Sequence, residues 1–246
     1  MYILTIILIT FILYYIINNC IYDISIYIST KRTHTVGYPK IQTQDDFYTS
    51  KRCKELAKYI SKHKFVGRST LNGFGKTKGF VVTFSSRHEK QILDTFKPIH
   101  EVFKQIQEPG TNAYIFNPVI IEHSTKETER SIPYHYDMSL DDQAKTLFGQ
   151  SYLPVCVTVI YIQLPESYKG GKLCLAEYGS VDDSVIGMYK PKLGRKLTFR
   201  GDMMHHVEPI HCKDGKGKRI SLVFEQYKLP ESKLANIKFD ICKNDI

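Results

Sequence analysis

The second half of the chain is a succession of short β-strand patterns. From about residue 113 onward, apolar and β-branched residues recur in runs that are separated by turn signals such as Gly170-Gly171 and Asp182-Asp183. The runs are AYIFNPVIIEH, PVCVTVIYIQL, GKLCLAEY, SVIGMY, RKLTFRG, HHVEPI and RISLVFEQYKL. Because no long helical pattern intervenes, the order predicts an antiparallel sandwich or barrel rather than βαβ units.

Two helical patterns precede these strands. Residues 46–63, DFYTSKRCKELAKYISKH, place apolar side chains near helical spacing. Residues 87–107 carry an apolar stripe and contain Pro98, where we expect an interruption of the helix. We expect these helices to cover one side of a sheet, so residues 46–107 are predicted as helical support and residues 110–228 as the β core.

The amino terminus is a long apolar run. Its first 22 residues, MYILTIILITFILYYIINNCIY, have no charged side chain, and a helix of that length spans roughly 33 Å, enough for a bilayer core. A cleaved signal peptide is the alternative, but a basic n-region and an Ala-x-Ala site are missing. We therefore predict a single-pass membrane anchor at 1–29 and a polar linker at 30–45. Lys31 and Arg32 favour a cytoplasmic position for the rest of the chain, while the ER lumen stays open.

Composition limits the remaining organisation. A chain of 246 residues with 42% hydrophobic residues suits one domain with a sizeable core, which we place at 46–246. The formal net charge is +9, but lysine and arginine are spread along the chain. We interpret this charge as a solvated surface, and no basic patch with interleaved aromatic residues favours a nucleic-acid partner. The oligomeric state is left open.

One short motif suggests a metal site. His135 and Asp137 lie two positions apart in SIPYHYDMSL, so in an extended segment their side chains face the same way and can bind one ion. Two histidines and one carboxylate form the facial triad typical of non-haem Fe(II) oxygenases. The segment LTFRGDMMHHVEPI offers the third ligand as His205 or His206, which point to opposite faces of a strand.

A second motif places a cation on a strand. In GKRISLVFEQY, Arg219 and Ser221 share one face, whereas Ile220, Leu222 and Phe224 occupy the other. The planar guanidinium group donates two parallel hydrogen bonds to a carboxylate. The pair is therefore a candidate anion clamp that faces into a barrel, and the alternative is an edge-strand arginine in solvent.

These motifs together resemble a known superfamily. H-x-D, YIQLPESYKGGKLCL, LTFRGDMMHHVEPI and RISLVFEQY, in this order, are similar to the Fe(II)/2-oxoglutarate dioxygenases, and most similar to the prolyl-4-hydroxylase-like subgroup. The resemblance covers about residues 110–228. It implies a mainly β fold with flanking helices, a double-stranded β-helix or jelly-roll, which the predicted transmembrane helix would precede.

The resemblance also implies the metal ligands. It assigns iron binding to His135, Asp137 and His205. The family pattern His-x-Val-x-Pro is met only from His205, since Val207 shares its parity along the strand. His206 would then face away from the metal.

The cosubstrate and the reaction follow from the same resemblance. Arg219 would bind the distal carboxylate of 2-oxoglutarate, Ser221 would assist, and Tyr161 would line the pocket. Ascorbate is a further implied cofactor. The expected reaction hydroxylates a C–H bond, on a protein or peptide side chain such as proline, with release of succinate and CO2. The alternatives are a catalytically inactive β-helix that binds or scaffolds, and an oxygenase acting on a small molecule or on nucleic acid.

Overall fold

A computed structural model describes residues 41–67, 77–124, 130–140, 152–177, 185–213 and 215–242. Its strands are β1 (Ile41–Gln44), β2 (Thr77–Gly79), β3 (Val81–Ser85), β4 (Ala113–Glu122), β5 (Ile132–His135), β6 (Cys156–Gln163), β7 (Tyr168–Gly170), β8 (Leu173–Ala176), β9 (Val185–Tyr189), β10 (Lys196–Arg200), β11 (Met204–Val207), β12 (Ile210–Cys212), β13 (Lys218–Tyr227) and β14 (Asp240–Cys242). Its helices are α2 (Ser50–Ser61), α3 (Glu89–Thr95), α4 (Lys97–Ile106) and α5 (Glu231–Leu234), with a short 3-10 turn η1 (Ser86–His88).

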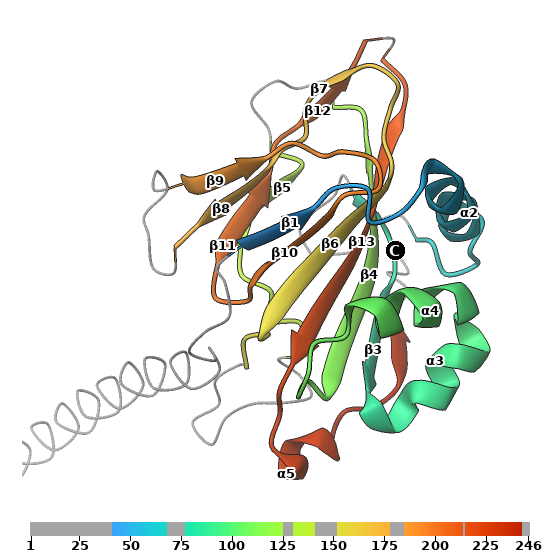
Figure 1. Cartoon of the computed structure of the whole chain (residues 1–246), viewed down its shortest axis with the longest axis vertical. Coiled ribbons are helices and arrows are strands. Elements are labelled where there is room, and N and C mark those ends of the chain that lie inside the picture. The colour runs from blue at the N-terminus through green and yellow to red at the C-terminus, as the bar shows by residue number, and fades with distance from the viewer. Residues whose placement is uncertain are drawn as a thin grey trace, which may run out of the picture.

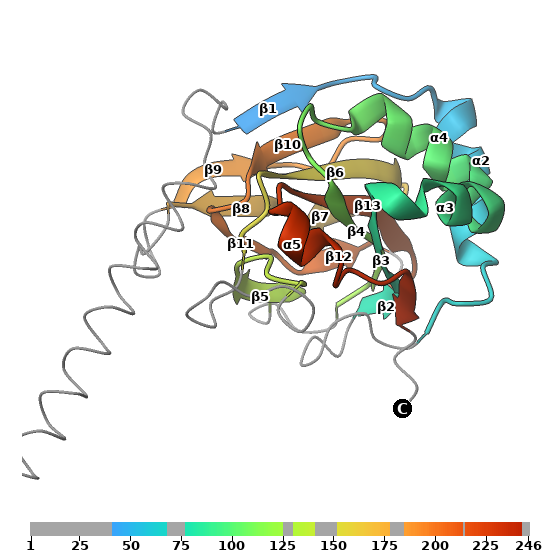
Figure 2. The ribbon, with the colours of Figure 1, turned by 90° about the horizontal axis from the view of Figure 1, so that it is seen from below.

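The strands form antiparallel sheets that face one another in a jelly-roll-like arrangement (Figures 1 and 2). The large sheet has the order β1-β10-β6-β13-β4-β3-β14, with β2 also paired to β4. A four-stranded sheet has the order β5-β11-β8-β9, and β12 pairs with β7. Strands that are distant in sequence thus become neighbours, and this brings separate motifs to one cavity.

The predicted fold class has to be corrected in one part, the N-terminal transmembrane helix. Within the ranges that the structure describes, no helix combines the length and the apolar character needed to cross a bilayer. The segment 1–29, where the anchor was placed, lies outside the described residues. The described residues support a mainly β fold with antiparallel sheets.

The large sheet begins inside the segment that was predicted as a linker. Residues Ile41–Gln44 form β1, which pairs with β10 along one side of the sheet. Only Ile41 packs against the interior, while the next three side chains are exposed. A strand with a single inward apolar residue has no alternating pattern, which is why the sequence did not predict it.

The side chains of β13 alternate between two apolar clusters, one beneath the helices and one between the sheets. Ile220, Leu222 and Phe224 pack with the helices on the outer face of the large sheet (Figure 1). Val223 belongs to the opposite face and packs with the apolar cluster between the sheets. This two-residue alternation confirms the predicted facing of the strand and directs its odd-numbered side chains into the cavity.

The helical pattern at 87–107 is interrupted as predicted. It forms α3 and α4, which meet at Phe96, and Pro98 lies in the first turn of α4. Proline is tolerated there because the backbone N–H groups of a first turn have no partner within the helix. The two short helices can therefore follow the curvature of the sheet they cover.

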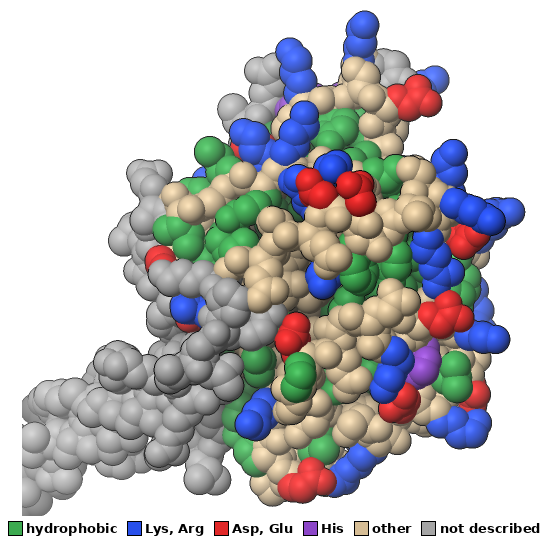
Figure 3. All heavy atoms as spheres, in the orientation of Figure 1, with side chains coloured by type: hydrophobic (Ala, Val, Ile, Leu, Met, Phe, Trp, Pro, Cys, Tyr) green, Lys and Arg blue, Asp and Glu red, His purple; other side chains and the backbone are tan. Residues whose placement is uncertain are grey.

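The basic side chains do not gather into one patch on the face in Figure 3, where acidic side chains are interspersed among them. Several form exposed ion pairs, such as Arg52 with Glu101 and Lys78 with Glu122. Exposed pairs of this kind contribute about 0–1 kcal/mol each to stability. On this face the positive charge is distributed as on an ordinary solvated surface.

Candidate metal and anion site

The predicted metal ligands meet in a cavity between the two sheets. His135 ends β5, and His205 of β11 lies directly opposite it in the antiparallel pairing. Asp137 follows two positions after His135, in the segment that leaves β5. One ligand atom from each of His135, Asp137 and His205 lies within 4.8 Å of the other two. A strand pairing and the i, i+2 spacing together assemble the cluster.

The two imidazole rings direct equivalent nitrogens at the carboxylate. His135 Nε2 lies 3.6 Å from Asp137 Oδ1, and His205 Nε2 lies 3.5 Å from Asp137 Oδ2. The Nδ1 atoms are 2.9 Å from the carbonyl oxygen of Pro133 and 3.2 Å from that of Met203. When Nδ1–H donates to these carbonyls, the Nε2 lone pairs point into the cluster, as in metal-binding histidines.

Burial and mutual charge set the protonation of the cluster. Burial, and then the charge of His135, lower the pKa of His205 to about 4, so this ring is neutral at neutral pH. Burial by itself raises the pKa of Asp137, but the two histidines outweigh burial. The pKa is therefore lowered overall, and the carboxyl is ionised. Burial lowers the pKa of His135, but the hydrogen bond and charge of Asp137 raise it overall. Because metal ligands must be deprotonated, a divalent cation would compete with protons for this cluster.

His206 lies on the other face of β11. It is buried, and its ring packs edge-on against Tyr134, with the ring centroids 4.3 Å apart. The cluster within 4.8 Å contains His205 instead. The structure thus places the two adjacent histidines as expected, and metal binding by His205 stays a prediction.

Arg219 is a buried cation at the other end of the cavity. Only 3% of its surface is exposed, and within the described residues no acidic side chain pairs with it. Its Nη1 donates to the carbonyl oxygen of Gly171 at 2.8 Å, while Nε has no hydrogen-bond partner in the part of the chain that the structure describes. Burial lowers the pKa of this guanidinium group. An isolated buried charge costs several kcal/mol, so this position is suited to an anionic ligand.

Three further buried polar atoms have no hydrogen-bond partner among the described residues. They are Ser221 Oγ and Asn117 Oδ1 on the cavity wall and the hydroxyl of Tyr161. Tyr161 lies beside Arg219, with its ring centroid 5.2 Å from the guanidinium carbon, and packs with the apolar cluster between the sheets. That it lines the pocket stays a prediction. Each buried unsatisfied group costs about 1–3 kcal/mol, which a polar ligand would offset.

Sequence reasoning missed Glu225, which also lines the cavity. Its side chain is 3% exposed and shares the inward face of β13 with Arg219. It accepts hydrogen bonds from Ser139 Oγ at 2.6 Å and from the hydroxyl of Tyr227. Burial, and then the charge of Asp137, raise the pKa of Glu225 to about 8. The parity that marked Arg219 and Ser221 could have identified Glu225 as well.

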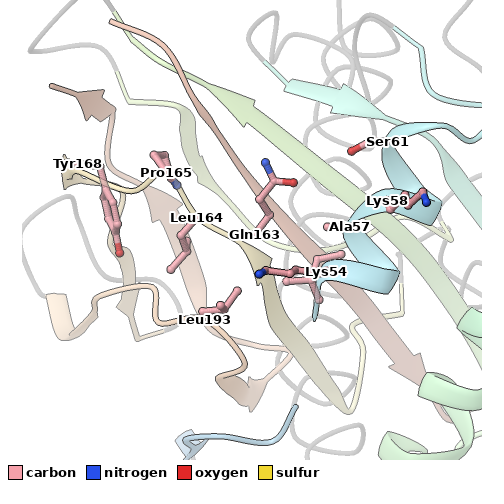
Figure 4. A pocket seen from close by; sticks show the side chains of 10 residues that line it. Lys54, Ala57, Lys58, Ser61, Gln163, Leu164, Pro165, Tyr168 and Leu193 are labelled. Atoms are coloured by element: carbon pink, nitrogen blue, oxygen red, sulfur yellow. The ribbon is translucent and has the colours of Figure 1, made fainter. Parts of the chain in front are cut away.

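A second hollow lies outside the sheets. Figure 4 shows it between α2, which contributes Lys54 and Lys58, and the end of β6 near Leu164. Its volume is about 540 Å³, whereas the cavity between the sheets is narrow, about 50 Å³. The two share no lining residue, and the outer one contains none of the metal-cluster residues.

Comparison with solved structures finds proteins with a similar fold. A prolyl-4-hydroxylase from Pseudomonas putida is 15% identical, with 78% of this chain and 94% of that chain covered and a TM-score of 0.47. The viral collagen prolyl hydroxylase of Paramecium Bursaria Chlorella virus-1, in its 2OG complex, is 13% identical, with 80% and 99% covered and a TM-score of 0.45. A Trichoplax adhaerens prolyl hydroxylase in complex with a hypoxia inducible factor peptide fragment is 11% identical, with 85% and 92% covered and a TM-score of 0.47.

Neither a protein-family model nor a curated protein matches the chain. A further similar structure is an oxidoreductase of the 2OG-Fe(II) oxygenase family from Burkholderia pseudomallei, which is 11% identical, with 77% of this chain and 86% of that chain covered and a TM-score of 0.45.

Proposed function

We propose that the protein is an Fe(II)- and 2-oxoglutarate-dependent dioxygenase that hydroxylates a C–H bond and releases succinate and CO2. The observation that carries this proposal is one cavity that contains both a two-histidine, one-carboxylate cluster and a buried arginine without an acidic partner. Such a cluster leaves coordination positions open for a cosubstrate. A dicarboxylate is suited to this cavity because one end can bind the metal and the other can neutralise Arg219.

The donor set fits Fe(II). His135 and His205 offer imidazole nitrogens, and Asp137 offers a carboxylate whose Oδ2 is buried without a hydrogen bond. When bound, Fe(II) supplies the activation of O2, which the side chains cannot provide by themselves. The carbonyl groups of Pro133 and Met203 hold the rings in orientation, so the ligands are arranged before the metal arrives.

Arg219 and Ser221 would position 2-oxoglutarate. They lie two residues apart on the inward face of β13, where the arginine provides charge and the serine hydroxyl is free to donate. The narrow cavity means that lining side chains move when the cosubstrate enters, a change of rotamer that is common on binding. Apolar walls then keep water from the reacting groups; they comprise Val119, Ile132, Val157, Val159, Leu173, Val207 and Val223.

We further propose that the substrate is a protein or peptide side chain, the class that the sequence resemblance implies. Proline is the side chain that this resemblance suggests first, and ascorbate as a cofactor stays a prediction on the same basis. The cluster of His135, Asp137 and His205 shares its cavity with Arg219, which supports turnover over a β-helix that only binds.

Full-length protein supplied with Fe(II), 2-oxoglutarate, O2 and a panel of peptides should release succinate. Asp137→Ala should reduce this release to background, because it removes the single carboxylate of the cluster. Asp45→Ala is the matched control, since Asp45 is exposed and pairs with Arg195 at the surface. If the unaltered protein releases no more succinate than Asp137→Ala with any peptide, the chain binds without turnover and the proposal fails.

A further inference from the structure

The hollow outside the sheets is bounded by α2 on one side and by Tyr168 on the other (Figure 4). It shares no residue with the cavity that contains the metal cluster, and the proposed chemistry assigns it no task. Its volume of about 540 Å³ falls within the range of about 300–1,000 Å³ that is usual for ligand sites. The hollow is therefore large enough to hold a ligand of its own.

One stripe of α2 forms a wall of this hollow. It has the spacing i, i+3, i+4 and i+7, which places side chains on one face of a helix, and it comprises Lys54, Ala57, Lys58 and Ser61. Lys54 and Lys58 are exposed, and among the described residues no acidic side chain pairs with either of them. Like charges four positions apart on a helix repel each other, and an anionic ligand would relieve this repulsion.

Two further lysines lie beside the hollow. Lys218 Nζ donates to Ser61 Oγ at 3.2 Å, and Lys190 Nζ lies 5.8 Å from the ring centroid of Tyr168. Among the described residues no acidic side chain lines the hollow, and Glu166, in the loop between β6 and β7, is exposed and is not part of the wall. The positive charges thus lie at separate points around an edge that lacks negative charge.

Apolar side chains form the floor between these charges. Ile162 is buried, whereas Leu164 and Leu193, which lie between α2 and Tyr168 in Figure 4, are only half-buried. The hydroxyl of Tyr168 donates to the carbonyl oxygen of Pro191 at 2.8 Å, and this bond holds the ring in place as the far wall. The half-buried leucines leave apolar surface in contact with water, which an apolar group of a ligand would remove.

The positions of the charges favour a peptide over a compact anion. A phosphate or a single carboxylate needs donors that converge on one point, whereas Lys58 on α2 and Lys190 beside Tyr168 lie on opposite sides of the apolar floor. An acidic peptide can place separate carboxylates near separate lysines and an apolar side chain on the floor between them. Complementary charges of this kind provide specificity in protein recognition.

We propose that this hollow is a docking site for an acidic segment of a partner protein, in which carboxylates flank an apolar side chain. The site lies outside the cavity of the metal cluster, so binding there does not depend on the proposed dioxygenase function. It gives α2 a function in addition to covering the large sheet.

The test measures the fluorescence anisotropy of labelled peptides with the full-length protein at physiological salt. The probes have glutamates at both ends and a leucine in the middle, and they differ in the number of glycines that separate these residues. At least one probe should bind saturably, and about tenfold more tightly than the same peptide with glutamine for glutamate or with glycine for leucine.

Variants of α2 locate the binding site. Lys54→Glu combined with Lys58→Glu should weaken binding about tenfold, because repulsion replaces attraction. Lys51→Glu combined with Lys62→Glu is the matched control, since these exposed lysines belong to the same helix and its cap but do not line the hollow. This control changes the net charge equally and should retain the affinity.

An equal loss of affinity in the two double variants would show a general effect of charge and would overturn the proposal. Equal binding of the leucine and glycine peptides, tighter binding of a single-stranded oligonucleotide than of every acidic peptide, or no saturable binding across the series would overturn it as well. The affinity should be the same in Asp137→Ala and with or without Mn(II) and 2-oxoglutarate, so a failure of the dioxygenase function is distinguishable. Circular dichroism of each variant reports its folding.

Discussion

Arg219→Ala should weaken the binding of 2-oxoglutarate by more than about 1.5 kcal/mol, or more than tenfold, because it removes charge-assisted hydrogen bonds to the distal carboxylate. Mn(II) affinity should hardly change, since Arg219 is not part of the cluster of ligand atoms. Calorimetric titration of the metal-free protein with Mn(II), and of the Mn(II)-loaded protein with 2-oxoglutarate, measures the two constants. Arg219→Lys should give an intermediate loss, because an ammonium group keeps the charge but not the planar pair of donors.

The matched control for this experiment is Arg195→Ala. Arg195 pairs with Asp45 at the surface and lies outside the cavity lining. Its removal should leave the affinity for 2-oxoglutarate unchanged. If Arg219→Ala also left that affinity unchanged, the anion would have to bind elsewhere in the molecule.

His205→Ala should abolish metal binding, whereas His206→Ala should retain most of it. His205 supplies one of the three clustered ligand atoms, and His206 packs against Tyr134 on the other face of β11. Loss of groups that only orient a ligand typically costs 10–100-fold in metal affinity, so loss of a ligand should cost more than about 100-fold. Titration of each variant with Mn(II) measures the difference, and turnover should follow the same order.

Loss of metal binding in His206→Ala but not in His205→Ala would show that His206, and not His205, is the ligand. His206 is buried, so His206→Ala also removes packing and should lower the free energy of unfolding. Circular dichroism of both variants separates a loss of the fold from a loss of the site. A folded His206→Ala variant without metal affinity would show that the strand register is shifted by one residue.

Much of the site could be predicted because it depends on local spacing. His135 and Asp137 share a direction through the i, i+2 rule, and the same rule turns Arg219 and Ser221 inward together. These relations hold for any extended strand, whatever it packs against. The sequence therefore predicted the order of strands and the candidate ligands, with the choice of His205 aided by family resemblance.

The remaining features depend on tertiary packing. Strand parity turns Glu225 inward with Arg219, but its hydrogen bonds with Ser139 and Tyr227 depend on how the loop after β5 packs against β13. Tyr161 has the same parity on β6 as Val157 and Val159, but its contact with the guanidinium group depends on the pairing of β6 with β13. The polar strand β1 could not be predicted from the sequence, because its pairing with β10 defines it as a strand.

Calorimetric titration of the unaltered full-length protein with 2-oxoglutarate, in the presence and absence of Mn(II), tests the central claim most directly. Mn(II) replaces Fe(II) because it is not oxidised during the experiment. The central claim is that a single 2-oxoglutarate molecule binds both the metal and Arg219. We expect 2-oxoglutarate to bind at one site when Mn(II) is bound and at least tenfold more weakly without it. Binding of equal strength with and without Mn(II) would show that the metal cluster and Arg219 do not share a ligand, and would contradict the proposed function.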